Sequence, residues 1–219
     1  MDYQLVKKPR ILCLHGFRSS SAILKKELEI WPEFVLNMMD LVFLDAPFPA
    51  EGEPSGEGKF PPYYEWFESN EDHSEYRNFD ECVAYIEDCM VRLGPFDGLL
   101  GLSQGALLAA ALPGMQKHVV ALTRIPKIKF VIIVSGGQLG GKEFSAPKVT
   151  ENAFSSTIEC PSLHFIGEKD FAKQNGIELL KSYLDPFVIY HHEGHGVPKL
   201  DEKGLEIMLS FIQKIKRLL

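Results

Sequence analysis

The sequence has little cysteine, with only four thiols, scattered at Cys13, Cys82, Cys89 and Cys160 among 219 residues. None of them forms a C-x-x-C pair, so the spacing indicates neither a zinc site nor a disulfide framework. Thiol usage of this kind fits a reducing compartment. Since the first four residues have no signal-peptide character, we expect a cytoplasmic protein that could also be nuclear.

Long apolar runs and basic stripes are missing as well. No stretch approaches the roughly 18 consecutive apolar residues of a membrane span, so we expect none. The formal net charge of −7 weighs against nucleic acid as a partner, because duplex binding depends on neutralising phosphates. The chain shows no internal repeat and no nucleotide-binding glycine fingerprint, and we expect no cofactor.

Six short apolar runs alternate with helical patterns along the chain. The runs cover residues 10–14, 41–44, 96–100, 129–134, 162–166 and 187–190. The amphipathic or helix-forming segments between and after them are 22–30, 78–93, 106 onward, 173–183 and 197–219. Continuously apolar strands are typical of parallel sheets that are buried on both faces. We predict one α/β domain over residues 1–219, with about six mostly parallel strands and helices on both faces.

A Gly-x-Ser-x-Gly pentapeptide at residues 101–105 stands between an apolar run and an Ala- and Leu-rich helix. This is the context of a nucleophile elbow, in which a sharp strand-to-helix turn exposes the serine. The strained turn needs small residues two before and two after Ser103, and Gly101 and Gly105 meet that need. The structural alternative is a glycine-rich turn between a strand and a helix, in which the serine has no catalytic role.

Other reactive side chains follow other strands of the predicted sheet. His15 follows the first strand, Asp170 the fifth and His195 the sixth. Active residues of open α/β sheets lie outside the carboxyl ends of the strands. The chain order of nucleophile, acid and histidine is that of the α/β-hydrolases.

These positions suggest catalytic roles. His195 is the candidate base for Ser103, and Asp170 would orient the imidazole; Glu168 is a competing acid with a longer side chain. The backbone N–H groups of Phe17 and Gln104 are the candidate oxyanion hole. The run from His191 to His195 is only superficially metal-like, and we expect no metal.

An irregular stretch at about residues 50–77 carries the densest aromatic cluster of the chain. Long loops in compact domains are often functional, so it is a candidate lid, with a loop pinned to the core as the equal alternative. Aromatic walls are usual in acyl pockets. The candidate substrate-binding residues are His15, Phe17, Phe48, Tyr63, Trp66, Phe67 and Val197.

Five motifs together resemble the FSH family of small serine hydrolases. They are Leu-His-Gly-Phe at 14–17, Leu-Asp-Ala-Pro at 44–47, Gly-Leu-Ser-Gln-Gly-Ala at 101–106, Gly-Glu-Lys-Asp at 167–170 and Gly-His-Gly-Val-Pro at 194–198. The resemblance implies an α/β-hydrolase fold without a large cap domain, and a triad of Ser103, Asp170 and His195. It also implies esterase or thioesterase activity on acyl substrates, and we expect esters or thioesters of apolar acyl groups. The alternative is a slow or non-catalytic small-ligand receptor on the same fold. The sequence leaves monomer and homodimer equally open.

Overall fold

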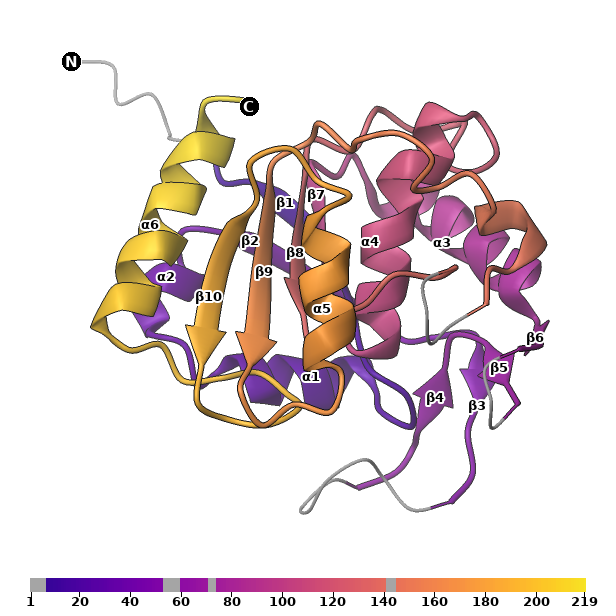
Figure 1. Ribbon diagram of the computed structural model, residues 1–219, viewed down its shortest axis with the longest axis horizontal. Helices are drawn as coiled ribbons and strands as arrows, with labels where there is room; N and C mark the ends of the chain where they lie inside the picture. Colours follow the sequence, from indigo (N-terminus) through magenta and orange to yellow (C-terminus); the bar gives the residue numbers. More distant parts are fainter. Residues whose placement is uncertain (1–6, 53–59, 71–73, 141–144) are drawn as a thin grey trace.

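A six-stranded sheet forms the centre of the computed structural model, which describes residues 7–52, 60–70, 74–140 and 145–219 (Figure 1). In spatial order the strands are β10 (Phe187–His191), β9 (Ser162–Gly167), β8 (Phe130–Val134), β7 (Gly98–Leu102), β1 (Arg10–Leu14) and β2 (Asp40–Leu44). Every neighbouring pair in this sheet is parallel. The predicted α/β fold is therefore confirmed.

Helices cover the two faces of the sheet in two groups. One face is packed by α1 (Ser21–Leu28), the single turn α2 (Glu33–Leu36) and α6 (Glu202–Lys216). The other face is packed by α3 (Phe79–Leu93), α4 (Gln104–Lys117) and α5 (Lys173–Leu180). Because strand side chains alternate between the faces, Ile11 and Cys13 join the first core and Leu12 and Leu14 the second.

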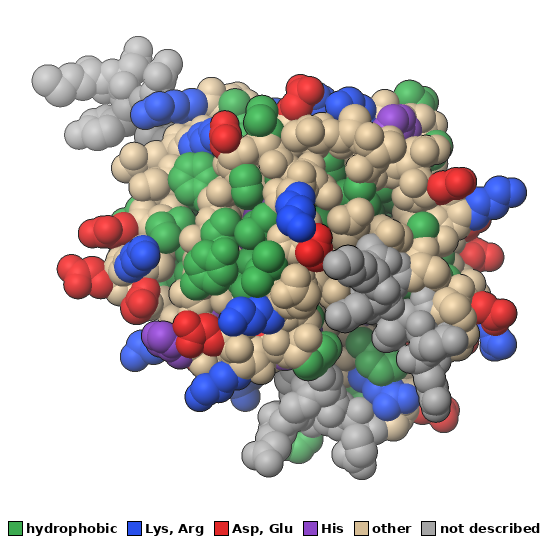
Figure 2. Space-filling view, in the orientation of Figure 1, with side chains coloured by type: hydrophobic (Ala, Val, Ile, Leu, Met, Phe, Trp, Pro, Cys, Tyr) green, Lys and Arg blue, Asp and Glu red, His purple; other side chains and the backbone are tan. Residues whose placement is uncertain are grey.

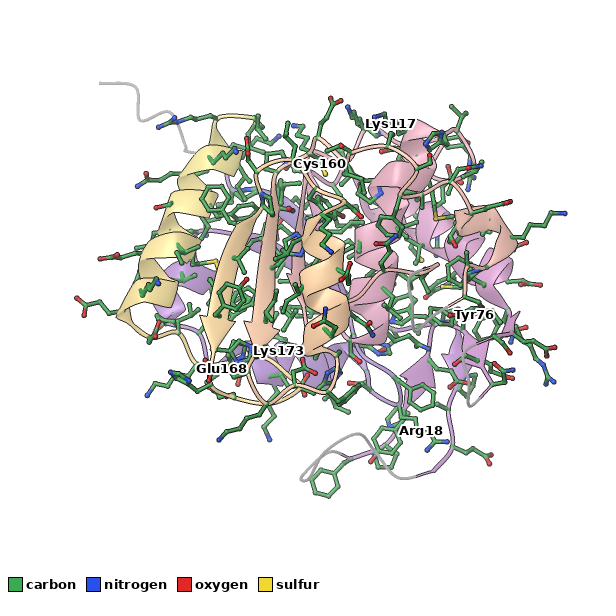
Figure 3. The ribbon with its side chains drawn as sticks, in the orientation of Figure 1. Arg18, Tyr76, Lys117, Cys160, Glu168 and Lys173 are labelled. Atoms are coloured by element: carbon green, nitrogen blue, oxygen red, sulfur yellow. The ribbon has the colours of Figure 1, made fainter. Side chains whose placement is uncertain are left out.

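The direction in which successive strands are added to the sheet reverses at β1. From β1 it passes to the edge strand β2, and then crosses back to β7 on the other side of β1. The loops after β1 and β7 therefore part at a topological switch point, where open α/β sheets bind ligands. Figure 3 shows Glu168 and Lys173 at this carboxyl edge of the sheet, with Arg18 farther along the same end of the molecule.

Two of the predicted boundaries that move in the structure bear on the site. The strand before the elbow was expected at 96–100 but is Gly98–Leu102, because Gly101 and Leu102 pair with Ile133 and Val134 of β8. The last helix was expected from Val197 but begins at Glu202, where the Asp201 carboxylate caps it by accepting from the Gly204 N–H at 2.7 Å. The segment after His195 is thus a loop that can line a site.

The irregular stretch at 50–77 is only partly described, since 53–59 and 71–73 lie outside the described residues. Its described part forms short antiparallel pairs. In them β3 (Phe48–Pro49) pairs with β4 (Tyr64–Glu65), and β5 (Glu68–Ser69) pairs with β6 (Tyr76–Arg77). A second irregular stretch, before β9, holds the 3₁₀ turn η1 (Lys148–Thr150).

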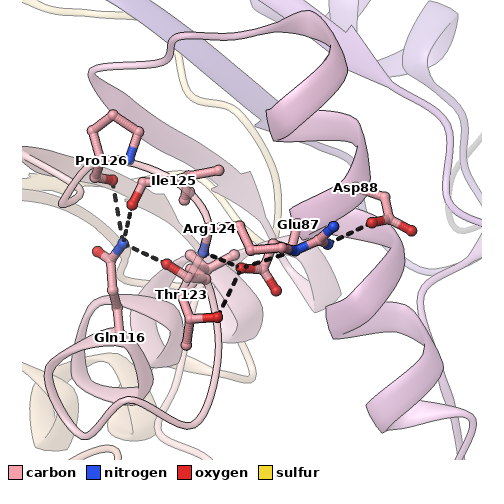
Figure 4. A network of polar contacts seen from close by, with 8 residues as sticks. Glu87, Asp88, Gln116, Thr123, Arg124, Ile125 and Pro126 are labelled. Atoms are coloured by element: carbon pink, nitrogen blue, oxygen red, sulfur yellow. Dashed lines mark hydrogen bonds and ion pairs between the residues drawn. The ribbon is translucent and has the colours of Figure 1, made fainter.

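Polar contacts fix the segment that joins α4 to β8 (Figure 4). The Gln116 amide nitrogen donates to the carbonyl oxygens of Leu122, Ile125 and Pro126, at 2.9 to 3.4 Å. Arg124 donates through its backbone N–H to Glu87 of α3 at 2.7 Å. These bonds hold the end of the molecule opposite the carboxyl edge, so they support the scaffold rather than the site.

The outer strand β10 leaves part of the sheet uncovered. Figure 2 shows apolar side chains gathered over β9 and β10, with charged groups around them, and Tyr190 is 57% exposed. Within the part of the chain that the structure describes, no helix has the length and apolar character needed to cross a membrane.

Candidate active site

Ser103 lies at the sharp turn between β7 and α4 in a backbone conformation that few residues other than glycine adopt, with φ 53° and ψ −114°. The two glycines of the pentapeptide make this turn possible. A Cβ on Gly101 would lie 2.2 Å from the Gly105 carbonyl oxygen, and one on Gly105 would lie 2.2 Å from that of Leu14. The strain is thus held by close backbone packing, as at many functional sites.

A chain of hydrogen bonds joins the three side chains predicted to act together. The Ser103 hydroxyl oxygen Oγ lies 2.8 Å from His195 Nε2, and His195 Nδ1 lies 2.8 Å from Asp170 Oδ1. A carboxylate can only accept, so Nδ1 carries a proton and Nε2 is free to accept the serine proton. The residues come from the ends of β7, β9 and β10.

Asp170 is 6% exposed, and its carboxylate is held from several directions. Its Oδ1 also accepts from the Ala172 backbone N–H at 2.7 Å. Burial opposes its ionisation, but hydrogen bonds from His195, Ser135 and Ala172 keep the pKa of Asp170 below its ordinary value. Asp170 is therefore a fixed negative charge beneath the imidazole.

Ser135 is a residue that sequence reasoning missed. It follows β8 with φ 50°, is 5% exposed, and its hydroxyl accepts from the Gly196 N–H at 3.2 Å. Since it also bonds the Asp170 carboxylate, it ties the acid to the histidine loop. Its place at a strand's carboxyl end, before two glycines, was the available signal.

Two backbone N–H groups are in place as candidate oxyanion donors. Those of Phe17 and Gln104 find no hydrogen-bond acceptor among the described residues, and both residues line the same cavity as Ser103. Gly105 N–H donates to the His15 carbonyl at 3.1 Å, which fixes the loop after β1 against the start of α4. The arrangement can stabilise negative charge that develops on a bound carbonyl oxygen.

His15 lies in the core and not in the cavity wall, contrary to its place among the substrate-binding candidates. It is fully buried, its Nδ1–H donates to the Gly16 carbonyl at 2.7 Å, and its Nε2 accepts from the Ala46 N–H at 3.0 Å. Burial lowers its pKa to about 4, so the ring is neutral and serves to shape the loop.

The aromatic segment 64–67 is bonded to both oxyanion loops. Trp66 donates its backbone N–H to Gln104 Oε1 at 2.9 Å and its indole N–H to the His15 carbonyl at 2.8 Å. Gln104 in turn donates its side-chain nitrogen to the Phe67 carbonyl at 2.7 Å. Ser19 and Tyr64 exchange backbone hydrogen bonds in addition. This part of the stretch is therefore pinned to the elbow.

The cavity in front of Ser103 has a volume of about 570 Å³. Of the predicted substrate-binding residues, Phe17 and Phe67 line it. Trp66 does not, because its side chain is fully buried beneath the loop. Phe48 is packed against the core, Tyr63 lines neither this cavity nor its neighbours, and Val197 lines a separate groove beside His195.

A second residue that sequence reasoning missed is Phe171. Its ring stacks on that of His195, with centroids 4.3 Å apart and planes at 22°. The side chain is 81% exposed, so core packing does not account for its position. It follows Asp170 directly, and the bond from Ala172 to that carboxylate fixes the turn that places it.

Glu168, the competing acid, points elsewhere. It pairs with the exposed His192 at 2.7 Å, and this contact lowers the pKa of Glu168. Its charge is thus engaged outside the site. Among the described residues, no group of three His, Cys, Asp or Glu side chains is placed to hold a metal ion.

Comparisons with known proteins find relatives over most of the chain. The family described as "Serine hydrolase (FSH1)" matches residues 3–206. "Esterase CG5412" of Drosophila melanogaster is 27% identical over 97% of this chain and 76% of its own length. "Esterase OVCA2" of Homo sapiens is 30% identical over 86% of this chain and 89% of its own length.

Solved structures show the same fold. Zea mays acyl-protein thioesterase 2 superposes with a TM-score of 0.62 over 99% of this chain and 97% of its own, at 19% identity. Paleococcus ferrophilus monoacylglycerol lipase superposes with a TM-score of 0.60 over 96% of both chains, at 13% identity. At these identities the likeness concerns the fold alone.

Proposed function

The chain belongs to the serine hydrolase (FSH1) family, and from this premise we propose that it cleaves carboxylic esters or thioesters of apolar acyl groups. The observation that carries the proposal is the continuous hydrogen-bonded chain from Ser103 through His195 to Asp170, at 2.8 Å for each link. The named esterase relatives support the same reaction class.

The reaction proceeds in two stages. Ser103 Oγ attacks the acyl carbonyl carbon while His195 Nε2 takes the hydroxyl proton. The N–H groups of Phe17 and Gln104 hold the oxyanion, and Asp170 stabilises the imidazolium. The imidazolium gives its proton to the leaving oxygen or sulfur, which departs and leaves an acyl-enzyme. Water, deprotonated by His195, then releases the acid and restores Ser103.

The cavity walls favour an apolar acyl group. Phe67 and Leu107 form part of the wall near Ser103, while Arg18, Glu65 and Glu68 contribute the charged part of the lining. Burial is the main cause that raises the pKa of Glu65, with Glu68 adding to it and Arg18 opposing it. Opposite charges in one lining give no strong preference for an ionic substrate, so apolar burial supplies the binding.

Labelling with a fluorophosphonate tests the proposal most directly. We expect the wild-type protein to be labelled and to hydrolyse p-nitrophenyl esters, and Ser103→Ala to lose both, because the probe requires an activated serine. The exposed Ser155→Ala is the matched control and should keep both. Asp170→Asn should lower kcat by about 10⁴, the loss typical when the base takes the wrong tautomer.

A well-folded wild type that is not labelled would overturn the enzyme assignment. A small-ligand receptor on the same fold would then be the better account.

A further inference from the structure

A groove of about 810 Å³ adjoins the cavity that holds Ser103. The two linings have one residue in common, His195. A smaller space of about 30 Å³ lies between them, and it is lined by Ser103 and Phe17 from the first cavity and by Glu27 and Gly196 from the groove. The groove thus borders the residues that carry the reacting atoms.

Three parts of the chain form the groove. They are helix α1, residues 60–62 and the loop after β10 that carries His195. Its apolar lining includes Ile23, Ile30, Phe60 and Val197. Ile30 is 45% exposed and Phe60 is 77% exposed, so both present apolar surface to whatever occupies the groove.

The groove lacks the features that an acyl site needs. Phe17 and Gln104, whose N–H groups are placed for the carbonyl oxygen, line the first cavity and not the groove. An acyl carbonyl held by them leaves the acyl chain in that cavity. The groove is joined to the site instead through His195, the group that returns a proton to the leaving atom.

Phe171 restricts the direction in which the rest of the leaving group can extend from the leaving atom. Its ring covers one face of the imidazole at 4.3 Å and lines the first cavity only. On the groove side, His195 is followed by Gly196 and Val197, and a Cβ built on Gly196 would meet none of the described residues within 4 Å. On this side the described residues therefore leave room for an arm on the leaving oxygen or sulfur.

We propose that the groove binds the leaving-group arm of the substrate, a neutral alcohol or thiol with an extended apolar part. The inference rests on the proposed function, since it assigns the second half of the ester that Ser103 cleaves. Among the described residues, the charged side chains in the lining are Lys26, Glu27 and Glu193. Charges of both signs give no strong preference for an ionic arm, and the apolar lining favours an uncharged one.

Two neighbouring lysines of α1 give a matched test. Lys26 lines the groove and Lys25 does not, and both are exposed. Lys26→Trp and Lys25→Trp remove the same charge and add the same ring, but only the first fills the groove. The probes are methyl, butyl and octyl butanoate for the leaving group, and methyl acetate, butanoate and octanoate for the acyl group.

We expect Lys26→Trp to lower kcat/KM for octyl butanoate about tenfold relative to methyl butanoate, the scale on which a hydrophobic pocket discriminates. Its dependence on acyl length should match that of the wild type. Lys25→Trp should change neither series. Ala22→Trp, at another exposed position of the groove wall, should repeat the effect of Lys26→Trp.

Two results would overturn the inference. A selective loss of kcat/KM for methyl octanoate in Lys26→Trp would show that the groove binds the acyl chain. An unchanged kcat/KM across the leaving-group series in both groove variants would show that the groove binds no part of the substrate. Failure of the proposed function is distinguishable, because it would show as absent fluorophosphonate labelling of Ser103 in the wild type.

Discussion

At the scale of single residues, His195 is held on three sides by groups of different kinds. Asp170 fixes one ring nitrogen, Ser103 lies at the other, and Phe171 covers a face of the ring. The two hydrogen bonds set the direction of the ring nitrogens, while the stacked phenyl ring restrains rotation out of the plane. An aromatic face also interacts favourably with the positive imidazolium that forms during acyl transfer.

We therefore predict that Phe171→Ala lowers kcat about three- to fivefold on short esters with little change in KM, the scale of one aromatic contact. Because Phe171 is 81% exposed, the free energy of unfolding should change by less than about 0.5 kcal/mol. Steady-state kinetics and the proton NMR signal of His195 Nδ1–H check this, and that signal should broaden in the variant.

Phe171→Trp should restore kcat, since it keeps a stacking ring. Phe34→Ala removes a Phe that is 53% exposed on α2 and is the control for loss of a surface ring. Equal kcat values for wild type and Phe171→Ala would show that the stack does not position the imidazole.

At the scale of elements, the segment 64–67 acts as a brace across the two loops that supply the oxyanion donors. Trp66 bonds the loop after β1 through the His15 carbonyl and the start of α4 through Gln104. Gln104 closes the link by donating to Phe67. Buried hydrogen bonds of this kind fix relative position, because breaking one leaves a polar group without a partner.

Trp66→Phe removes the indole N–H but keeps an aromatic ring, and leaves the His15 carbonyl with the Gly105 N–H as its remaining donor. We predict a loss of about 0.5–1.5 kcal/mol in the free energy of unfolding. We also expect an approximately tenfold lower kcat with KM nearly unchanged, because misplaced oxyanion donors weaken the transition state more than the bound substrate. Denaturant unfolding and ester kinetics on the same preparation measure both.

The matched control is Tyr183→Phe. Tyr183 is 5% exposed and donates its hydroxyl to a carbonyl, that of Ala110 within α4 at 2.8 Å, away from both oxyanion loops. Its loss of stability should be similar, with kcat within twofold of the wild type. Similar kcat losses in both variants would mean that general destabilisation, not the brace, explains the effect.

This brace also marks a limit of sequence-based prediction. The composition of 50–77 suggested aromatic side chains for a pocket, yet Trp66 is buried and faces the backbone of other loops. No local pattern reveals such a contact, because its partners lie 38 and 51 residues away. Whether other parts of the stretch act as a lid stays a prediction.

At the scale of the whole molecule, the parallel sheet explains why so much of the site was predictable. Parallel strands bring their carboxyl ends to one edge, so residues at the ends of apolar runs meet without further assumptions. Ser103, Asp170 and His195 were found in this way, and they lie in hydrogen-bonding contact. Ser135 ends another such strand and could have been found by the same rule, whereas the turn that places Phe171 depends on the Ala172 backbone.

The same packing makes the folded protein sensitive to acid through buried neutral histidines. Burial lowers the pKa of His15 to about 4 and that of His164 to about 3, against about 6.5 for an unfolded histidine. Between these values the unfolded chain binds protons that the folded protein does not. The free energy of unfolding therefore increases with pH across this window. Conversely, it decreases as the pH falls from about 6.5 toward 4.

Each of these histidines contributes about 1.4 kcal/mol per pH unit to that slope. Denaturant unfolding between pH 6.5 and 4.5 measures this slope. His164→Gln should reduce it by the contribution of one histidine, about 1.4 kcal/mol per pH unit. His118→Gln, at an exposed position, is the control for loss of a histidine. A stability that stays constant over this range would show that the folded protein takes up the same protons as the unfolded chain, and that the His15 and His164 sites admit charge.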